Sequence, residues 1–393
     1  MRSLFRIGII LLVVPLLVQC ATYYHRPSTN AQYVDETWMR AVDMTSRPWL
    51  HGASTWFISD NDQLKMLDRA LPRDMVMSTM HIHIPYTLTT LNVKGRFKVQ
   101  IVESDQATGV TLYGPYQAVR CVNVVVTPQT LYLTESNHAP LYMHYVIVRV
   151  NLKYLTGLTQ NGVGQIEGRL MRGSLLYIVS QGTGDIYLRG LNRLKSVTVK
   201  NKGNVTVLNA VTPFLTVTTD NQGSMNASGR VGIAEIIHHG SGDINIIGVD
   251  TDRLSITADG QGKIGLAGRL VINKIVAKDH MCVYAFDVSG HLLDVQLMNN
   301  ASVGLKGHVH TVYVDAHQTS QFLGRYLYVQ NAFLRANDAA HINTATTHQL
   351  FATANADSSI YYFVTPKLLN KTVNGSGVIL PIMSWGGEVN LSR

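Results

Sequence analysis

The chain has few charged residues and few cysteines. Asp, Glu, Lys and Arg make up 15% of its 393 residues, against about a quarter in an average soluble domain. Ser, Thr, Asn, Gln, Gly and Tyr must therefore cover much of the surface, which is more typical of extracytoplasmic β-proteins than of cytosolic enzymes. The three cysteines, Cys20, Cys121 and Cys282, show no CxxC or Cys/His spacing of a zinc site. Cys121 and Cys282 could form a disulfide in an oxidising compartment, or remain as two unpaired thiols.

Motifs of common catalytic and cofactor sites are also missing. The sequence has no GxSxG nucleophile elbow. Residues 260–265 read GQGKIG and match GxGxxG, but a dinucleotide site needs this loop to open a helix, and a strand pattern follows here. Residues 240–243 read GSGD, as in calcium-binding nonapeptide repeats, but those repeat about every nine residues with an Asp in each repeat. We therefore expect no cofactor and no metal.

The sequence contains 15 histidines, and histidine is a common metal ligand. His81 and His83, and His308 and His310, are two residues apart, so each pair shares one face of a strand and could hold a metal. Neither pair has a nearby carboxylate or third ligand in the sequence. We expect these histidines to be solvated or hydrogen-bonded.

The N-terminus predicts export. Arg2 and Arg6 precede an apolar run over residues 7–18, which is too short for a membrane span of about 20 residues, so residues 1–19 are interpreted as a signal peptide. Residues 17–20, LVQC, resemble the lipobox of bacterial lipoproteins, in which Cys20 would receive the lipids. Gln19 departs from the Gly, Ala or Ser of that family, and a plain signal peptide or retained anchor in which Cys20 is incidental stays open. Lipidation would tether the chain to the membrane, as an outer-membrane lipoprotein of the bacterial envelope facing the periplasm or the cell surface.

The segment between the signal and residue 160 divides into two. Residues 20–85 are expected to be a tether with a short helical pattern over residues 60–71. Residues 86–160 are expected to be β-rich, with strands over 93–101, 122–126, 131–133 and 142–150. This β-rich region is predicted to cap one end of the repetitive segment over residues 161–384, and residues 385–393 to cap the other end.

An apolar position recurs every 18 to 20 residues through residues 161–384. A fixed period in this range is the signature of a solenoid. The pattern predicts an all-β fold, a parallel β-helix of about twelve coils of roughly 20 residues, each with two strands and two corners. The recurring positions, called anchors below, are Ile166, Ile186, Val205, Met225, Ile244, Ile264, Val283, Val303, Phe322, Ile342, Ile360 and Ile379.

Glycines recur at fixed distances from the anchors. Because strand reversals need positive φ, which Gly adopts at little steric cost, we interpret these glycines as corner residues. Asp279, Asn299, Asp338 and Asp357 would replace Gly at the corners that lack it. Four places after an anchor they are Gly190, Gly229, Gly248, Gly268 and Gly307, and two places before it, as the predicted structural turn glycines, they are Gly164, Gly184, Gly203, Gly223, Gly242, Gly262 and Gly377.

The corners over residues 161–164, 181–186 and 239–244 (NGVG, QGTGDI and HGSGDI) resemble those of the head GIN domain, a family of autotransporter-adhesin-like proteins of unknown function. The strand patterns over 97–102, 110–114, 131–133 and 146–148 are similar as well. The resemblance extends over about residues 88–380 and implies a right-handed, pectin-lyase-like superhelix without catalytic residues, with a role in adhesion. Coils from Val283 to Ile360 lack the GxG corner.

Two classes of function remain. The first is a lipid-tethered, non-catalytic solenoid for adhesion, glycan binding or envelope structure, with no nucleic-acid partner and an undetermined oligomeric state. The second is a polysaccharide lyase or hydrolase with an unrecognised site, in which basic residues three places past an anchor gather an anionic polymer. Asp185 and Asp243 lie three coils apart, or about 14 Å at about 4.8 Å per coil, whereas paired glycosidase carboxylates are about 5 to 9.5 Å apart. The basic residues are Arg169, Arg189, Lys306 and Arg325, and the column before the anchors otherwise includes Gln165, Asn204, Ser224, Lys263, Ser302, Gln321, His341 and Ser359.

Overall fold

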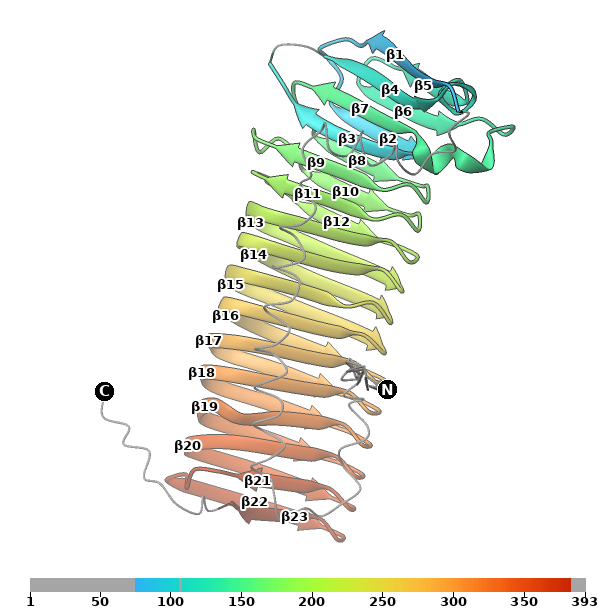
Figure 1. Cartoon of the computed structure of the whole chain (residues 1–393). Coiled ribbons are helices and arrows are strands. Elements are labelled where there is room, and N and C mark those ends of the chain that lie inside the picture. Colours follow the sequence, from blue (N-terminus) through green and yellow to red (C-terminus); the bar gives the residue numbers. More distant parts are fainter. Residues whose placement is uncertain (1–74, 106–107, 383–393) are drawn as a thin grey trace, which may run out of the picture.

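The computed structural model describes residues 75–105 and 108–382 (Figure 1). The expected signal peptide, Cys20, the helical pattern at 60–71 and the segment 385–393 lie outside the described residues. None of the helices in the described part has the length and apolar character needed to cross a membrane.

Almost all the regular structure is β-strand, arranged as one long stack (Figure 1). The two helical elements are short: α4 (Tyr116–Val119) and the 3-10 turn η2 (Leu141–Tyr145). The strands are β1 (Met77–His83), β2 (Thr90–Lys94), β3 (Lys98–Glu103), β4 (Gly109–Pro115), β5 (Val122–Val126), β6 (Thr130–Glu135), β7 (Ile147–Leu152), β8 (Gly157–Gln160), β9 (Ile166–Leu170), β10 (Tyr177–Ser180), β11 (Ile186–Gly190), β12 (Ser196–Val199), β13 (Asn204–Asn221), β14 (Ser224–Gly240), β15 (Ile244–Gly260), β16 (Lys263–Ala277), β17 (Cys282–Leu297), β18 (Ser302–Ala316), β19 (Gln321–Ala336), β20 (His341–Asn355), β21 (Ser359–Tyr362), β22 (Leu368–Asn374) and β23 (Val378–Pro381).

The predicted solenoid is confirmed. Each of the twelve anchors pairs in parallel with the anchor of the next coil, from Ile166 with Ile186 to Ile360 with Ile379, in a single continuous column. At the N-terminal end of the column, Ile166 also pairs in parallel with Val99. The sequence period is therefore the length of chain that one coil of the solenoid uses.

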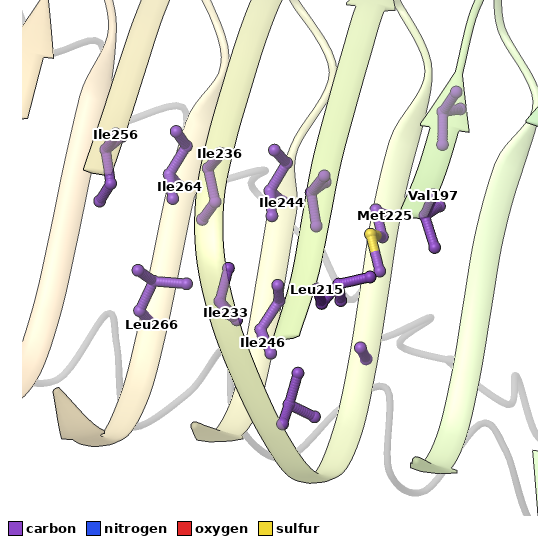
Figure 2. Packing of buried hydrophobic residues seen from close by; sticks show 14 of the residues in the cluster. Val197, Leu215, Met225, Ile233, Ile236, Ile244, Ile246, Ile256, Ile264 and Leu266 are labelled. Carbon is purple, nitrogen blue, oxygen red and sulfur yellow. The ribbon is translucent and has the colours of Figure 1, made fainter. Parts of the chain in front are cut away.

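The interior of the solenoid is a continuous apolar core. All twelve anchors are buried, each with at most 4% of its surface exposed. Figure 2 shows how Met225, Ile244 and Ile264 on one side of the coil point towards Leu215, Ile236 and Ile256 on the other. Alternate residues along a strand face opposite sides of the sheet, so the positions between these buried residues form the outer surface.

The two strands of a coil merge in the middle of the solenoid. From β13 to β20 each coil is one strand of 15 to 18 residues that bends between its two halves. The bend lies four places after the anchor, at Gly229, Gly248, Gly268 and Gly307, all with positive φ. Where glycine is missing, Asn209 and Asp287 take this position, also with positive φ. This part of the glycine prediction is confirmed.

The glycines two places before the anchors have a different cause from the predicted one. The residues with positive φ in that corner lie two places earlier, at Asn201, Gly240, Gly260, Asp279 and Asn299. Gly242 and its equivalents do not adopt positive φ. A Cβ on Gly242 would instead lie 1.9 Å from the carbonyl oxygen of Gly223 in the preceding coil. Gly164, Gly184, Gly203, Gly242 and Gly262 thus serve the close approach of two backbones, whereas at Gly223 the nearest atom is Val199 Cγ1. The interpretation by positive φ is wrong for Gly164, Gly184, Gly203, Gly223, Gly242, Gly262 and Gly377. Asp357 is likewise not the positive-φ residue of its corner, which is Ala356.

The N-terminal end of the stack departs from sequence order. β2 lies between β6 and β8, and β3 lies between β7 and β9, all in parallel. The coil made by β6 and β7 therefore stacks outside the coil that precedes it in the sequence. β4 then pairs antiparallel with β7, β1 with β4, and β5 with β6.

Two of the expected strands in this region are different in the structure. The strand predicted over 93–101 is two strands, β2 and β3, joined by a corner at Gly95–Phe97. The strand predicted from Tyr142 begins only at Ile147, because residues 141–145 form η2. β1 begins at Met77, inside the segment that the sequence suggested as a tether.

Candidate functional site

The corner that precedes each anchor forms one edge of the solenoid, which we call the glycine-corner edge. A groove of about 680 Å³ runs along this edge, within the roughly 300–1,000 Å³ of small-molecule sites. Its described lining consists of Thr183, Asn201, Lys202, Gln222, Gly240, Ser241, Gly260 and Gln261. Amides, hydroxyls and one ammonium line it, without a carboxylate.

Side chains in this groove have few internal partners. Asn201 donates from Nδ2 to the carbonyl oxygen of Gln181. The side chains of Lys202, Gln222 and Gln261 have no hydrogen-bond partner within the described part of the chain. They are exposed and available to a ligand.

Further along the solenoid, polar side chains of the same edge form hydrogen bonds with one another. There Asn299 Nδ2 donates to Asp279 Oδ1 at 2.6 Å, and Asn300 Nδ2 lies 2.9 Å from His280 Nε2. Asn299 N donates to Gln318 Oε1 at 2.6 Å. The polar side chains in the later coils satisfy one another, while those in the groove do not.

The carboxylates considered for catalysis have structural partners. Asp185 Oδ1 accepts hydrogen bonds from the backbone N and the Nδ2 of Asn204, both at 3.0 Å. Asp243 Oδ1 accepts from the backbone N of Lys263 at 3.0 Å. Desolvation raises the pKa of Asp243, although its side chain remains exposed. The two aspartates are three ladder steps apart, and each one bonds to the following coil, as expected for a hydrogen-bonding ladder.

The four basic residues do not form one row. Arg169 and Arg189 are register neighbours. Lys306 pairs with Tyr326, because the register shifts between β18 and β19, and Arg325 lies over the ring of Phe363 at 4.7 Å. Only the first two residues lie side by side.

An ion-pair cluster that the sequence analysis did not identify lies near the bends of β14 to β16. Asp250 accepts from Arg230 Nε at 3.1 Å and from Arg269 Nε at 2.7 Å. Hydrogen bonds from Arg269 and Arg230 lower the pKa of Asp250. These residues come from three successive coils, so their proximity depends on the register. Two arginines already neutralise the carboxylate, so Asp250 links neighbouring coils through surface ion pairs.

The histidine pairs differ in surroundings. His81 Nδ1 lies 3.0 Å from Thr111 Oγ1 on β4. His308 and His310 both project outward from β18, and no group of three or more His, Cys, Asp or Glu suited to a metal occurs in residues 75–105 and 108–382. Cys121 is a free thiol, so it forms no disulfide with Cys282.

A second groove, which we call the histidine groove, surrounds this pair at the bends of β18 to β20. It has a volume of about 370 Å³ and is lined by His308, Val309, His310, Tyr328, Val329, Gln330 and Thr347. The sequence indicated the spacing of His308 and His310, but the partners from neighbouring coils follow only from the three-dimensional register.

Comparison with known proteins gives a family match. Residues 87–279 match the family described as "Putative auto-transporter adhesin, head GIN domain". These residues belong to the head GIN domain family. The match ends at the coil where the GxG corner disappears from the sequence.

Solved structures similar to this head GIN protein share little sequence with it. A putative adhesin from Bacteroides fragilis NCTC 9343 is 17% identical, with a TM-score of 0.32, over 78% of this chain and 97% of that chain. A putative lipid binding protein from Parabacteroides distasonis ATCC 8503 is 15% identical, with a TM-score of 0.25, over 78% and 97% of the two chains. A putative adhesin from Parabacteroides merdae ATCC 43184 is 14% identical, with a TM-score of 0.28, over 79% and 98%. With such low TM-scores none of these similarities supports a further argument, and no curated protein matches the chain.

Proposed function

We propose that this head GIN protein is a non-catalytic binding protein of the bacterial cell envelope that holds a neutral glycan chain along the glycine-corner edge. The supporting observation is the groove in which the side chains of Lys202, Gln222 and Gln261 lack partners in the described chain. Successive coils repeat at about 4.8 Å, so the groove offers a periodic row of amides and hydroxyls. Such a row suits an extended polymer with many hydroxyl groups.

The composition of the groove favours an uncharged ligand. Amides and hydroxyls both donate and accept hydrogen bonds, as sugar hydroxyls do. The described lining contains one charged side chain, Lys202, which is too little for a strongly anionic polymer. The open shape admits a chain from the side, as surface attachment requires.

The alternative, a polysaccharide-active enzyme, has less support. General acid–base cleavage needs two carboxylates within about 5 to 9.5 Å of each other. Asp185 and Asp243 are separated by three coils and are each bound to the coil that follows. Formation of new reducing ends or unsaturated products from a polysaccharide, lost in Asp185→Asn or Asp243→Asn, would favour the enzyme.

Binding to neutral polysaccharides tests the proposed function. We expect the protein to retain at least one of a panel of dextran, arabinoxylan, mannan and xyloglucan in affinity electrophoresis. The variant Gln222→Ala/Gln261→Ala should lose this retention by about tenfold or more. Asn123→Ala/Gln129→Ala, which removes two exposed amides far from the groove, is the matched control. Equal retention of the groove variant and the native protein would contradict the proposal.

We also propose that Cys20 carries the lipid that tethers the chain to the bacterial outer membrane. The support is the lipobox-like sequence LVQC at residues 17–20 and the adhesin-like family, which suggests the envelope or the cell surface. Metabolic labelling with a palmitate analogue should mark the native chain and not Cys20→Ala. Cys121→Ala, which removes a cysteine that is a free thiol in the structure, should be labelled normally. Labelling of Cys20→Ala at the same level as the native chain would rule out this tether.

A further inference from the structure

The geometry points to a second binding site, for the carboxylate-bearing chain of an acidic polysaccharide, in the histidine groove. This groove lies at the bends that follow the anchors, whereas the glycine-corner edge lies at the corners that precede them. The two edges are at opposite ends of each coil. The inference therefore does not depend on the proposed neutral-glycan site.

The histidine groove has two walls built from stacked rings. His291 of β17 pairs in register beside His310 of β18, with ring centroids 5.1 Å apart. On the other side His308 stacks on Tyr328 of β19, with centroids 5.3 Å apart and planes 19° apart. Both stacks run along the solenoid axis, because their members come from successive coils.

The floor between the walls is apolar. Val309 and Val329 lie between the outward residues of their strands and are 4% and 1% exposed. They are register partners and belong to the core. The groove is therefore a slot with an apolar base and polar rims, which matches a sugar ring with its apolar face down and its substituents toward the walls.

Polar groups on the rims are available to a ligand. His308, Tyr328 and Gln330 have no hydrogen-bond partner within the described residues. His310 uses Nδ1 toward Thr311 Oγ1 at 2.9 Å, which leaves Nε2. Imidazole N–H, phenol O–H and amide N–H groups all donate to carboxylate oxygens, and bonds to a charged acceptor are stronger than neutral ones.

The charge around the groove favours an anion. Lys306, His308 and His310 are all exposed on β18, and His308 and His310 share one face of the strand. His291 of β17 and His348 of β20 are further exposed bases near this site. The acid closest in register is Asp287 of β17. It lies in a bulge, because Phe286 pairs with Lys306 and Val288 pairs with Gly307. Asp287 is not part of the lining of the groove.

Titration with polygalacturonate tests the site, with fully methyl-esterified pectin as a probe of the same backbone without charge. We expect the native protein to bind polygalacturonate about tenfold more tightly than the ester at pH 5.5. His308→Gln/His310→Gln should lose about tenfold in affinity at pH 5.5. Tyr328→Phe keeps the ring and removes the hydroxyl, and should lose a few-fold.

A matched control separates this site from a general effect of charge. His280→Gln/His317→Gln removes the same number of histidines at the glycine-corner edge, and should bind polygalacturonate as the native protein does. Equal loss in both double variants, or equal binding of the ester, would overturn the site. Binding that needs added Zn²⁺ and disappears with EDTA would overturn it in favour of a metal bridge.

The two proposed sites can fail separately. The His308→Gln/His310→Gln variant should retain neutral polysaccharides, and Gln222→Ala/Gln261→Ala should retain polygalacturonate. Melting temperatures of all variants within a few degrees of the native value would show that the folds are intact.

Discussion

Val199 occupies the space that a side chain on Gly223 would need: a Cβ on Gly223 would lie 2.5 Å from Val199 Cγ1. The two residues come from successive coils and meet inside the glycine corner. The same relationship joins Gln160 to Gly184, with a distance of 2.6 Å from Nε2 to the Cβ position, and His238 to Gly262, with 2.4 Å. The inward side chain of one coil is thus one of the groups that leave no room for a Cβ at the glycine of the next.

Later corners reverse this relationship. Ala316 and Ala336 take the inward position, and the buried residues Ala340 and Ser358 stand where the earlier coils have glycine. At these two coils a small inward residue accompanies a corner residue larger than glycine. The sequence of the corner can therefore change while the fold stays the same. This change of sequence occurs just after residue 279, where the family match ends.

A double-mutant cycle should detect the contact between Val199 and Gly223. Gly223→Ala should cost about 1 to 3 kcal/mol through overpacking, and Val199→Ala about 2 kcal/mol through a cavity. The double variant should cost about 1 kcal/mol less than the sum, because the smaller residue makes room for the new methyl group. Urea unfolding of the four proteins measures these values. Strict additivity would show that the two positions do not compete for space.

Gly242→Ala should be one of the most destabilising glycine substitutions. Its Cβ would lie 1.9 Å from the Gly223 carbonyl oxygen, and a backbone atom in a stacked coil cannot move aside cheaply. We expect a loss of about 3 kcal/mol. Gly265→Ala is the control, since its Cβ would meet only Asn245 Oδ1 at 3.0 Å and Ile244 O at 4.0 Å; it should change stability by about 0.5 kcal/mol or less. Similar melting temperatures for both variants would contradict this account.

Acid should destabilise the solenoid through His238. This side chain is fully buried, and its Nε2 has no hydrogen-bond partner. Burial lowers its pKa, so the folded state keeps it neutral while the unfolded chain binds a proton below about pH 6.5. Stability is therefore complete above about pH 6.5 and falls as the pH drops below that value.

The comparison of two adjacent histidines isolates this effect. In His238→Leu the melting temperature should fall less between pH 7.5 and pH 5 than in the native protein. The exposed His239, whose Nδ1 lies 2.8 Å from Asp259 Oδ2, provides the control His239→Gln, which should keep the native pH dependence. An unchanged slope in His238→Leu would assign the acid sensitivity to other groups.

Lys371 is expected to protect the C-terminal edge from association. Within the described residues β22 pairs only with β20, and β23 only with β21, so each leaves an open edge. Lys371 Nζ donates to the Tyr362 hydroxyl at 3.1 Å and to the Ile379 carbonyl at 3.0 Å, which places a charge at the end of the core. Charges near sheet edges oppose the addition of further strands.

Lys371→Met should therefore associate end to end. Sedimentation should show a concentration-dependent rise in mass, while Lys367→Met, a change at an exposed lysine nearby, should sediment as the native protein does. If both variants sediment alike, another feature protects this end.

We propose that the segment before residue 160 caps the N-terminal end. β2 and β3 cover β8 and β9, and β6 and β7 cover β2 and β3 (Figure 1). A fragment that begins at residue 160 would expose core residues such as Ile166 and Ile178, and should aggregate because solenoid ends need covering. Light scattering after refolding measures this. A monomeric fragment that unfolds cooperatively would refute the capping role.

The sequence by itself determined the repeat, because one apolar residue per coil must face the core and its recurrence from Ile166 to Ile379 is visible as a period. It also determined the bends at Gly229 and Gly248, since a backbone position with positive φ favours glycine. Such local requirements act within a few residues of the chain.

Only the tertiary structure decided what depends on neighbouring coils. Three features depend on contacts across the stack: β2 and β3 insert between strands that come later in the chain, Gly242 is sterically required, and His291 contacts His310. Residues about 20 positions apart become neighbours there, and register shifts such as the one between Gly304 and Lys306 change which side chains meet. A one-dimensional period fixes the spacing of the coils, but the side chains that share a groove are set by the register between them.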